Sequence, residues 1–334
     1  MTTVLERLAS LDDLEEVATG RAWRSFHAQL RAHDALPRRV ALVCRARIAQ
    51  LLGTEVEPGP SWSPEDLERL TQLRSWMDAA VFDARDRAAL AYAEQFIVDA
   101  NGIDRDLAAP VAAHLGDTGL VVLTVWLGVV ESEERLRRVL ALAPGRWTAD
   151  LDALGGVGAA TPGHVDAGVH PWPDVHDPTP PSVQDLLAVH ASDLAAARAA
   201  VGAASEGLVT ARTNELLRLI SANAVDCRFC RNVRYRGTGT DQLVAEEEIP
   251  ALLTGASAAG SSGLTTGEMA ATALGRAFFA GDGPLDAATA AALADAFEPQ
   301  ALLEAVVTIL RNPAGSKAMV ALGLIPDETP LVVL

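Results

Sequence analysis

The chain has 334 residues, enough for two domains of ordinary size, and 49% of them are hydrophobic, which indicates a globular protein and excludes a disordered one. Only 4% of the residues are aromatic and β-branched runs are scarce, so helices are favoured. The net charge is −17 and no Lys/Arg-rich run is present, which argues against nucleic acid or an anionic membrane as partner.

The beginning of the chain, Met-Thr-Thr-Val-Leu-Glu-Arg, lacks the charged-then-apolar layout of a secretory signal. The longest apolar segment, Leu120 to Val130, is interrupted by Thr124 and Gly128 and is shorter than the roughly 20 residues of a membrane-spanning helix. Three cysteines, an odd number, do not form a disulfide framework. We therefore expect a cytoplasmic protein.

The first predicted domain, residues 1–142, contains Cys44 in the run Val40-Ala-Leu-Val-Cys, which we expect in the core. Asp83 is a candidate N-cap for an alanine-rich amphipathic helix. The alternating charges of Glu131 to Arg138 are typical of a solvated helix face.

Residues 143–181 are rich in helix breakers and are interpreted as a linker. This segment also holds side chains of the types that bind divalent metals, namely His164, Asp166, His170, Asp174, His176 and Asp177. Their spacing fits no metal motif, so the linker interpretation is preferred and no metal site is predicted.

The second predicted domain, residues 182–334, opens with a capping box, Ser182-Val-Gln-Asp185, which predicts a long helix running through Leu194 and Ala197. Glu246 to Glu248 are expected in a solvated helix turn, and residues 255–263 in a surface loop.

Cys227 and Cys230 stand at CxxC spacing, and Glu215 lies twelve residues upstream. Such a cysteine pair can cycle between dithiol and disulfide or bind a metal. A glutamate one helix earlier could move the proton that the redox cycle needs. Zinc would require two more ligands, and the chain has no second CxxC and no HxxxH. The alternatives are two reduced structural cysteines and a Glu215 that is a helix-surface carboxylate paired with Arg212 or Arg218.

Cys227, Cys230 and Arg234 are spaced i, i+3 and i+7, which predicts one shared helix face. With Asp226 as N-cap, Cys227 would lie in the first turn, where the helix dipole favours a thiolate. Nearby arginines act in the same direction, so at least one thiol pKa should be lowered. These arginines are Arg228, Arg231, Arg234 and Arg236.

Two stretches, Phe82 to Leu142 and Leu264 to Leu324, align without a gap at an offset of 182, and Thr265 or Thr266 is the N-cap candidate matching Asp83. Upstream the alignment continues in a slightly shifted register. There Leu42, Thr54 and Glu57 stand in place of Glu215, Cys227 and Cys230. The first copy therefore lacks all three reactive positions and is predicted to be structural.

These motifs resemble the carboxymuconolactone decarboxylase superfamily, in its alkylhydroperoxidase D-like branch. The signature of that branch is a glutamate, eleven residues, Cys-x-x-Cys and a histidine four residues on. Glu215, Cys227 and Cys230 match it, whereas Arg234 stands at that histidine position and Phe229 at another. In the first half, Arg47-Ile-Ala-Gln-Leu-Leu-Gly-Thr-Glu and the segment from Phe82 are similar to other family runs.

The resemblance implies an all-α fold of two tandem alkylhydroperoxidase D-like helical bundles that form an internal pseudo-dimer, with the first copy degenerate. It also implies a homo-oligomer and a protein without a cofactor. In the family mechanism Cys230 would attack a peroxide, Cys227 would resolve the sulfenic acid, and Glu215 would be the base. Helix-terminus physics alone favours Cys227 as the more acidic thiol. Arg234 cannot shuttle protons near neutral pH, but it can bind a thiolate or an anionic substrate.

Three functions follow, in order of preference. The first is a peroxidase-like oxidoreductase that reduces a peroxide or disulfide and is itself reduced by a dithiol protein. The second is a lyase or isomerase of a small carboxylate, held by Arg234 and its neighbours, with Glu215 moving a proton. The third is a non-catalytic assembly protein.

Overall fold

The computed structural model describes residues 11–54, 56, 58, 62–142, 181–237, 242–254, 263–325 and 329–334. Residues 143–180 of the predicted linker, with their His/Asp set, lie outside the described residues, as do Glu57 and most of the predicted loop 255–263. The described part is mostly helical, which confirms the all-α prediction. Its strands, β1 (Val233–Arg234) and β2 (Val332–Val333), form one small parallel pair.

The helices divide between the two halves of the sequence, and 3₁₀ turns carry the letter η. Those of the first half are η1 (Leu11–Glu16), α2 (Ala18–Ala32), α3 (Arg38–Leu52), α4 (Pro64–Gln72), η2 (Leu73–Ser75), α5 (Ala84–Val98), η3 (Ala100–Gly102) and α6 (Arg105–Val139). Those of the second half are α8 (Val183–His190), α9 (Ser192–Ala203), α10 (Ala211–Ala224), α11 (Arg228–Asn232), η5 (Glu246–Glu248), α12 (Ile249–Thr254), α13 (Thr266–Ala280), α14 (Ala287–Ala296) and α15 (Pro299–Ala321).

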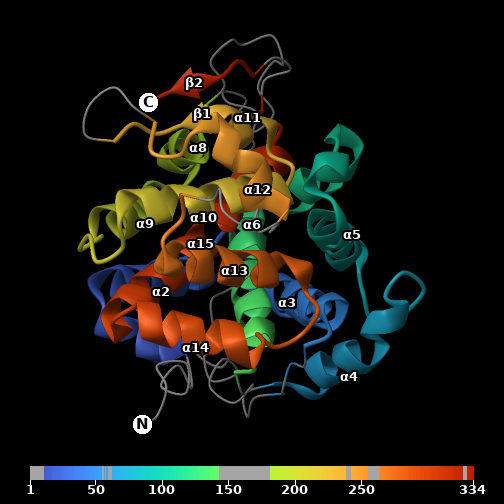
Figure 1. Cartoon of the computed structure of the whole chain (residues 1–334). Helices are drawn as coiled ribbons and strands as arrows, with labels where there is room; N and C mark the ends of the chain where they lie inside the picture. Colours follow the sequence, from blue (N-terminus) through green and yellow to red (C-terminus); the bar gives the residue numbers. More distant parts are fainter. Residues whose placement is uncertain are drawn as a thin grey trace.

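Helices α6 and α15 cross at the centre of the molecule, where α6 runs lengthwise through the fold (Figure 1). A Cβ atom on Gly128 of α6 would lie 2.8 Å from the carbonyl oxygen of Ala314 on α15, closer than real Cβ contacts. Only glycine therefore permits this approach of the two backbones. Buried side chains of both halves pack around the crossing in one apolar core, which includes Cys44 as predicted.

The two halves place helix boundaries at matching sequence positions. An offset of 182 relates the ends of α5 to those of α13, the start of α6 to that of α14, and the end of α6 to that of α15. Asp83 and Thr265 are the N-caps of α5 and α13, each in a capping box, as expected from the sequence. Gly116, where α6 kinks with φ 75°, corresponds to Glu298, the N-cap of α15.

The predicted single helix after Ser182 is wrong, although its capping box is confirmed. Ala191 has φ −155° and ψ 73°, so it ends α8 before α9 begins. The physical reason is tertiary packing: α8 contacts α6, whereas α9 turns away to pack along α2. No breaker residue marks the bend in the sequence.

The predicted solvated face from Glu131 to Arg138 is also wrong, because most of these charged side chains are buried. Glu131 pairs with Lys317 of α15 at 2.7 Å, and Glu134 pairs with Arg137 at 2.7 Å. Burial lowers the pKa of Lys317, while the Glu131 carboxylate opposes this shift. Opposite charges from α15 and from α6 itself thus allow these groups to leave water.

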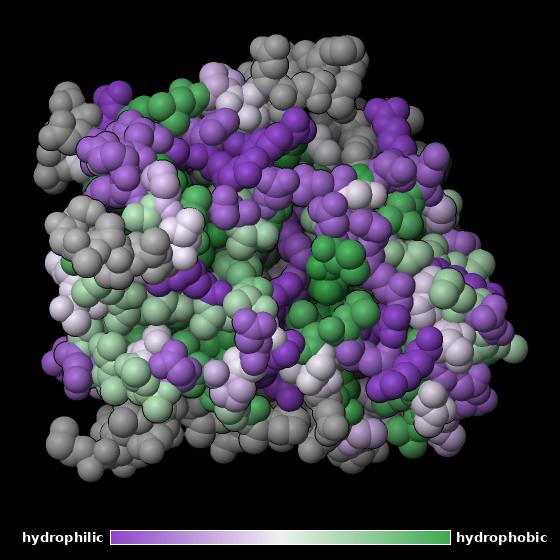
Figure 2. Space-filling view, turned by 45° about the vertical axis from the view of Figure 1, so that its right-hand side comes forward, coloured by the Kyte–Doolittle hydropathy of each residue, from purple (hydrophilic) through white to green (hydrophobic). Residues whose placement is uncertain are grey.

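By length and composition α6 could cross a membrane, and 67% of its most apolar window is buried against the rest of the chain. The core helix of a soluble protein passes the same test. On the face shown in Figure 2, apolar residues lie in small groups separated by hydrophilic ones. The exposed large apolar side chains include Met77, Val98, Val189 and Met269, which lie on separate segments of the fold. The homo-oligomer stays a prediction.

The substitution Gly128→Ala should lower the free energy of unfolding by about 1–3 kcal/mol, because the added methyl group forces α6 away from α15. Urea denaturation followed by circular dichroism measures this change. Gly267→Ala on α13 is the matched control, since a Cβ there would meet its nearest atom at 3.7 Å. Equal stability of the two variants would show that the crossing tolerates a side chain.

Candidate functional site

The CxxC segment begins in a tight turn after α10. Asp226 adopts a left-handed conformation, with φ 52°, and Cys227 is the residue that caps α11. The Sγ atom of Cys227 accepts a hydrogen bond from the amide of Cys230 at 3.2 Å. The prediction of Asp226 as N-cap is therefore wrong. Its carboxylate pairs instead with Arg231 at 2.7 Å.

The expected helix face shared by Cys227, Cys230 and Arg234 is also wrong. Helix α11 ends at Asn232, because β1 pairs with β2 and holds the following residues extended. Arg234 lies on β1, where its Nε and Nη2 atoms donate to the two carboxylate oxygens of Glu246 at 2.6 and 3.1 Å. Arg234 thus fixes the segment that follows α11, and its buried side chain is not part of the cavity lining.

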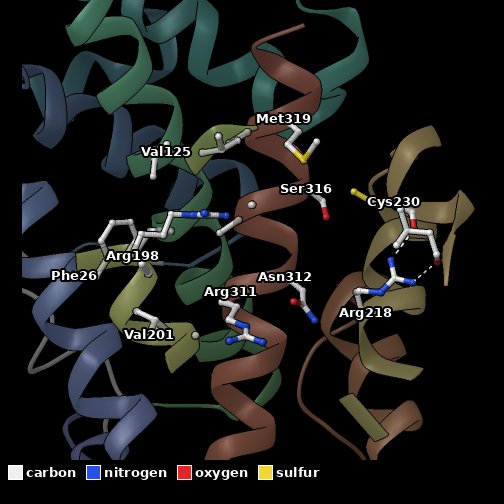
Figure 3. A pocket seen from close by; sticks show the side chains of 18 of the residues that line it. Phe26, Val125, Arg198, Val201, Arg218, Cys230, Arg311, Asn312, Ser316 and Met319 are labelled. Atoms are coloured by element: carbon white, nitrogen blue, oxygen red, sulfur yellow. Dashed lines mark hydrogen bonds between the residues drawn. The ribbon is translucent and has the colours of Figure 1, made fainter. Parts of the chain in front are cut away.

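A cavity of about 400 Å³ lies between α2, α6, α9, α15 and the CxxC segment (Figure 3). Cys230 lines this cavity, whereas Cys227 is 0% exposed and lies behind it. Ser316 and Met319, on the α15 side of the cavity, face the same space (Figure 3). The volume lies within the range of small-molecule binding sites.

The two thiols have opposite acid–base properties. A hydrogen bond from the Cys227 thiol, with support from Ser316 and the charge of Arg218, lowers the pKa of Cys230 to about 7 despite burial. The hydrogen bond to Cys230, together with burial, raises the pKa of Cys227. Near neutral pH the shared proton therefore belongs to Cys227, and Cys230 is substantially thiolate.

Glu215 is 3% exposed and forms a two-point ion pair with Arg218, at 2.6 and 2.7 Å. Arg218 also donates to the carbonyl oxygens of Cys230 and Val233, each at 2.6 Å. The predicted ion pair with Arg218 is therefore confirmed, whereas the predicted position of Glu215 on the helix surface is wrong, because its carboxylate is buried. Through Arg218, Glu215 holds the middle and the C-terminal end of α11 against α10, although among the described contacts it reaches neither thiol.

Three cavity residues that matter for the site were not identified from the sequence as site residues: Arg198, Arg311 and Ser316. They lie on α9 and α15, far from the cysteines in sequence, and no local motif marks them. From the sequence, Arg218 was named only as a possible ion-pair partner of Glu215. Its position three residues after Glu215 on one helix does predict that the two side chains meet.

Among the residues that the structure describes, no group of three or more His, Cys, Asp or Glu side chains is placed to hold a metal ion. The cavity lining likewise contains a single cysteine, Cys230, and no histidine. The chemistry available here is that of a thiolate, a neighbouring thiol and arginine side chains.

No protein-family model, curated protein or solved structure matches this chain. The resemblance to the carboxymuconolactone decarboxylase superfamily thus stays an expectation based on the motifs themselves.

Glu215→Gln should lower the free energy of unfolding by about 3 kcal/mol, because the half-buried Arg218 loses its counter-charge. Urea denaturation measures the loss. Glu248→Gln is the control, since its pair with Arg212 is more exposed and should contribute about 1 kcal/mol or less. A loss no larger than that of the control would contradict the structural role of the pair.

Alkylation of Cys230 by iodoacetamide should rise with pH and reach half of its maximum rate near pH 7, because the thiolate is the reactive form. An ordinary cysteine reaches half of its maximum alkylation rate at about pH 8.5. Cys227→Ala removes the hydrogen-bond donor and should move the midpoint upward. Peptide mass spectrometry of pH-jump samples follows the modified residue. An unshifted midpoint in the variant would rule out the shared proton.

Proposed function

We propose that this protein is a thiol-dependent, peroxidase-like oxidoreductase that reduces a peroxide or disulfide through Cys230 and Cys227. The observation that carries the proposal is a low-pKa Cys230 at the cavity surface with a protonated Cys227 directly behind it. Such a pair provides both a nucleophile and a resolving thiol. The motif resemblance to alkylhydroperoxidase D-like proteins supports the same reaction class.

With a peroxide, the Cys230 thiolate attacks one oxygen, the O–O bond breaks, and Cys230 becomes a sulfenic acid. The departing alkoxide takes the Cys227 proton and leaves as an alcohol. The resulting Cys227 thiolate attacks the sulfenic sulfur, so that a disulfide forms and hydroxide leaves as water after taking a proton from solvent. A dithiol protein then reduces the disulfide, returning both thiols.

In this scheme the roles of the other predicted site residues change. Glu215 acts through Arg218, whose charge favours the Cys230 thiolate, and the proton for the alkoxide comes from Cys227 rather than from a histidine. Arg234 supports the segment after α11 through Glu246. Both are positioning residues in the proposal.

The tandem arrangement, with units 1–142 and 182–334 as an internal pseudo-dimer, belongs to the same proposal. The matching helix boundaries at an offset of 182 support it. At that offset Glu134 stands where Ser316 does, and its carboxylate accepts a hydrogen bond from Thr54 at 2.8 Å. Arg45 and Arg137 also contact Glu134, so ion pairs fill the region that is open in the second unit.

A lyase or isomerase acting on a small carboxylate is the second candidate, favoured by the arginines that line the cavity. In that case Arg198 and Arg311, rather than Arg234, would hold the substrate. Activity that survives alkylation of both thiols would favour it. The third function, a non-catalytic assembly protein, predicts a filled site, and the cavity beside Cys230 argues against it. The cytoplasmic location and the homo-oligomer remain part of the proposal.

Hydrogen peroxide should convert the reduced protein to a Cys227–Cys230 disulfide that dithiothreitol reverses. Cys227→Ser should stop at a sulfenic acid on Cys230 that dimedone labels, and Cys230→Ser should leave peroxide unconsumed. Peroxide assays and peptide mapping measure these outcomes. Cys44→Ala is the control, because Cys44 is fully buried in α3. Unchanged peroxide turnover in either CxxC variant would exclude the redox pair.

A further inference from the structure

The cavity beside Cys230 has a charge opposite to that of the whole chain. The chain carries −17, yet the cavity lining contains Arg198, Arg218 and Arg311 and no side-chain carboxylate. A concave site lined by one sign of charge concentrates ligands of the other sign.

The three arginines differ in how far their charges are compensated. Arg218 is paired with Glu215. Arg198 donates to the neutral amide oxygen of Gln184 at 2.9 Å and makes no ion pair with a described residue. Arg311 has neither a hydrogen bond nor an ion pair to any described residue. Two cationic side chains therefore face the cavity without a carboxylate partner among the residues in the structure.

Arg198 and Arg311 reach toward each other's helix. A Cβ atom on Gly315 of α15 would lie 3.3 Å from Nη2 of Arg198, and one on Gly202 of α9 would lie 3.8 Å from Nη1 of Arg311. The glycines thus leave room for two guanidinium groups between α9 and α15, and both project into the cavity (Figure 3).

Keeping these two positive charges together in a buried place costs free energy. Burial lowers the pKa of both guanidinium groups, and the charge of Arg311 lowers that of Arg198 further. Tyr235 and Glu304 act on Arg311 in the opposite direction. The Glu304 carboxylate is itself engaged, since it accepts hydrogen bonds from the Ser205 hydroxyl and the Glu206 amide at 2.9 and 3.1 Å. A bound anion would relieve this repulsion.

The remainder of the lining is largely apolar, and Trp23, Phe26, Val125 and Val129 form the wall on the α2 and α6 side. This wall suits a hydrocarbon body and not a highly charged ligand such as a nucleotide. Cys230 faces the cavity from the side of the CxxC segment (Figure 3).

We propose that the cavity binds an amphipathic monocarboxylate, with its carboxylate held by Arg198 and Arg311 and its apolar body against the wall of α2 and α6. This inference rests on the proposed function only in assigning the reactive end of the ligand to Cys230. It makes the substrate a carboxylate-bearing organic peroxide or disulfide. Arginine binds carboxylates through paired, charge-assisted hydrogen bonds, which gives the site its selectivity.

Octanoate is a suitable probe, with octanamide as its neutral analogue, and isothermal titration calorimetry on the reduced full-length protein measures both. Octanoate should bind at least tenfold more tightly than octanamide and should slow the alkylation of Cys230. Equal affinity for octanoate and octanamide would overturn the proposal. Tighter binding of octyl phosphate than of octanoate would also overturn it, because the site would then prefer a phosphate to a carboxylate.

Arg311→Met and Arg198→Met should each weaken octanoate binding about tenfold or more, the loss expected for a charge-assisted contact. Without ligand, each variant should melt at a higher temperature than the parent protein, because the repulsion between the two guanidinium groups is gone. Arg276→Met is the control, since Arg276 donates to the Leu252 carbonyl outside the cavity. Octanoate affinity unchanged in both cavity variants would contradict the assignment.

The binding result and the redox result separate the two proposals. Octanoate binding that depends on Arg311, in a protein that does not consume peroxide, would support the carboxylate site and reject the redox function. Peroxide turnover without octanoate binding would do the reverse.

Discussion

The close crossing of α6 and α15 at Gly128 and Ala314 is the contact on which the rest of the structure depends. It brings the two halves of the chain into one core, and the cavity forms beside it. Arg311, Ser316 and Met319 lie within two turns of Ala314 on α15, and they line the cavity. The packing that joins the two halves therefore also positions these cavity-lining side chains of α15.

Around this crossing the two halves use buried polar groups differently. In the first half Glu134 accepts a hydrogen bond from Thr54 and forms ion pairs with Arg45 and Arg137. These two arginines compensate its negative charge. In the second half Arg198 and Arg311 line the cavity and make no ion pair with a described residue. Buried charges are tolerated in the first half because they are paired, and in the second half the proposed carboxylate ligand would supply the missing partner.

The thiol pair depends on short-range geometry imposed by the turn at Asp226. That turn makes Cys227 the cap of α11, where its buried sulfur accepts a hydrogen bond from the backbone amide of Cys230. Arg218 then contributes a fixed positive charge, which Glu215 holds in place. Arginine cannot exchange protons near neutral pH, so Arg218 favours the Cys230 thiolate through its charge alone.

The sequence by itself determined the helical class, the capped helix starts at Ser182, Asp83 and Thr265, and the spacing of the cysteine pair. These features depend on contacts within a few residues, which the order of amino acids specifies directly. Only the tertiary structure decided that the charges near Glu131 are buried, that the helix after Ser182 bends, and that arginines of α9 and α15 line the same cavity as Cys230. Burial and charge pairing depend on which helices become neighbours, and that choice is made by packing across the whole chain.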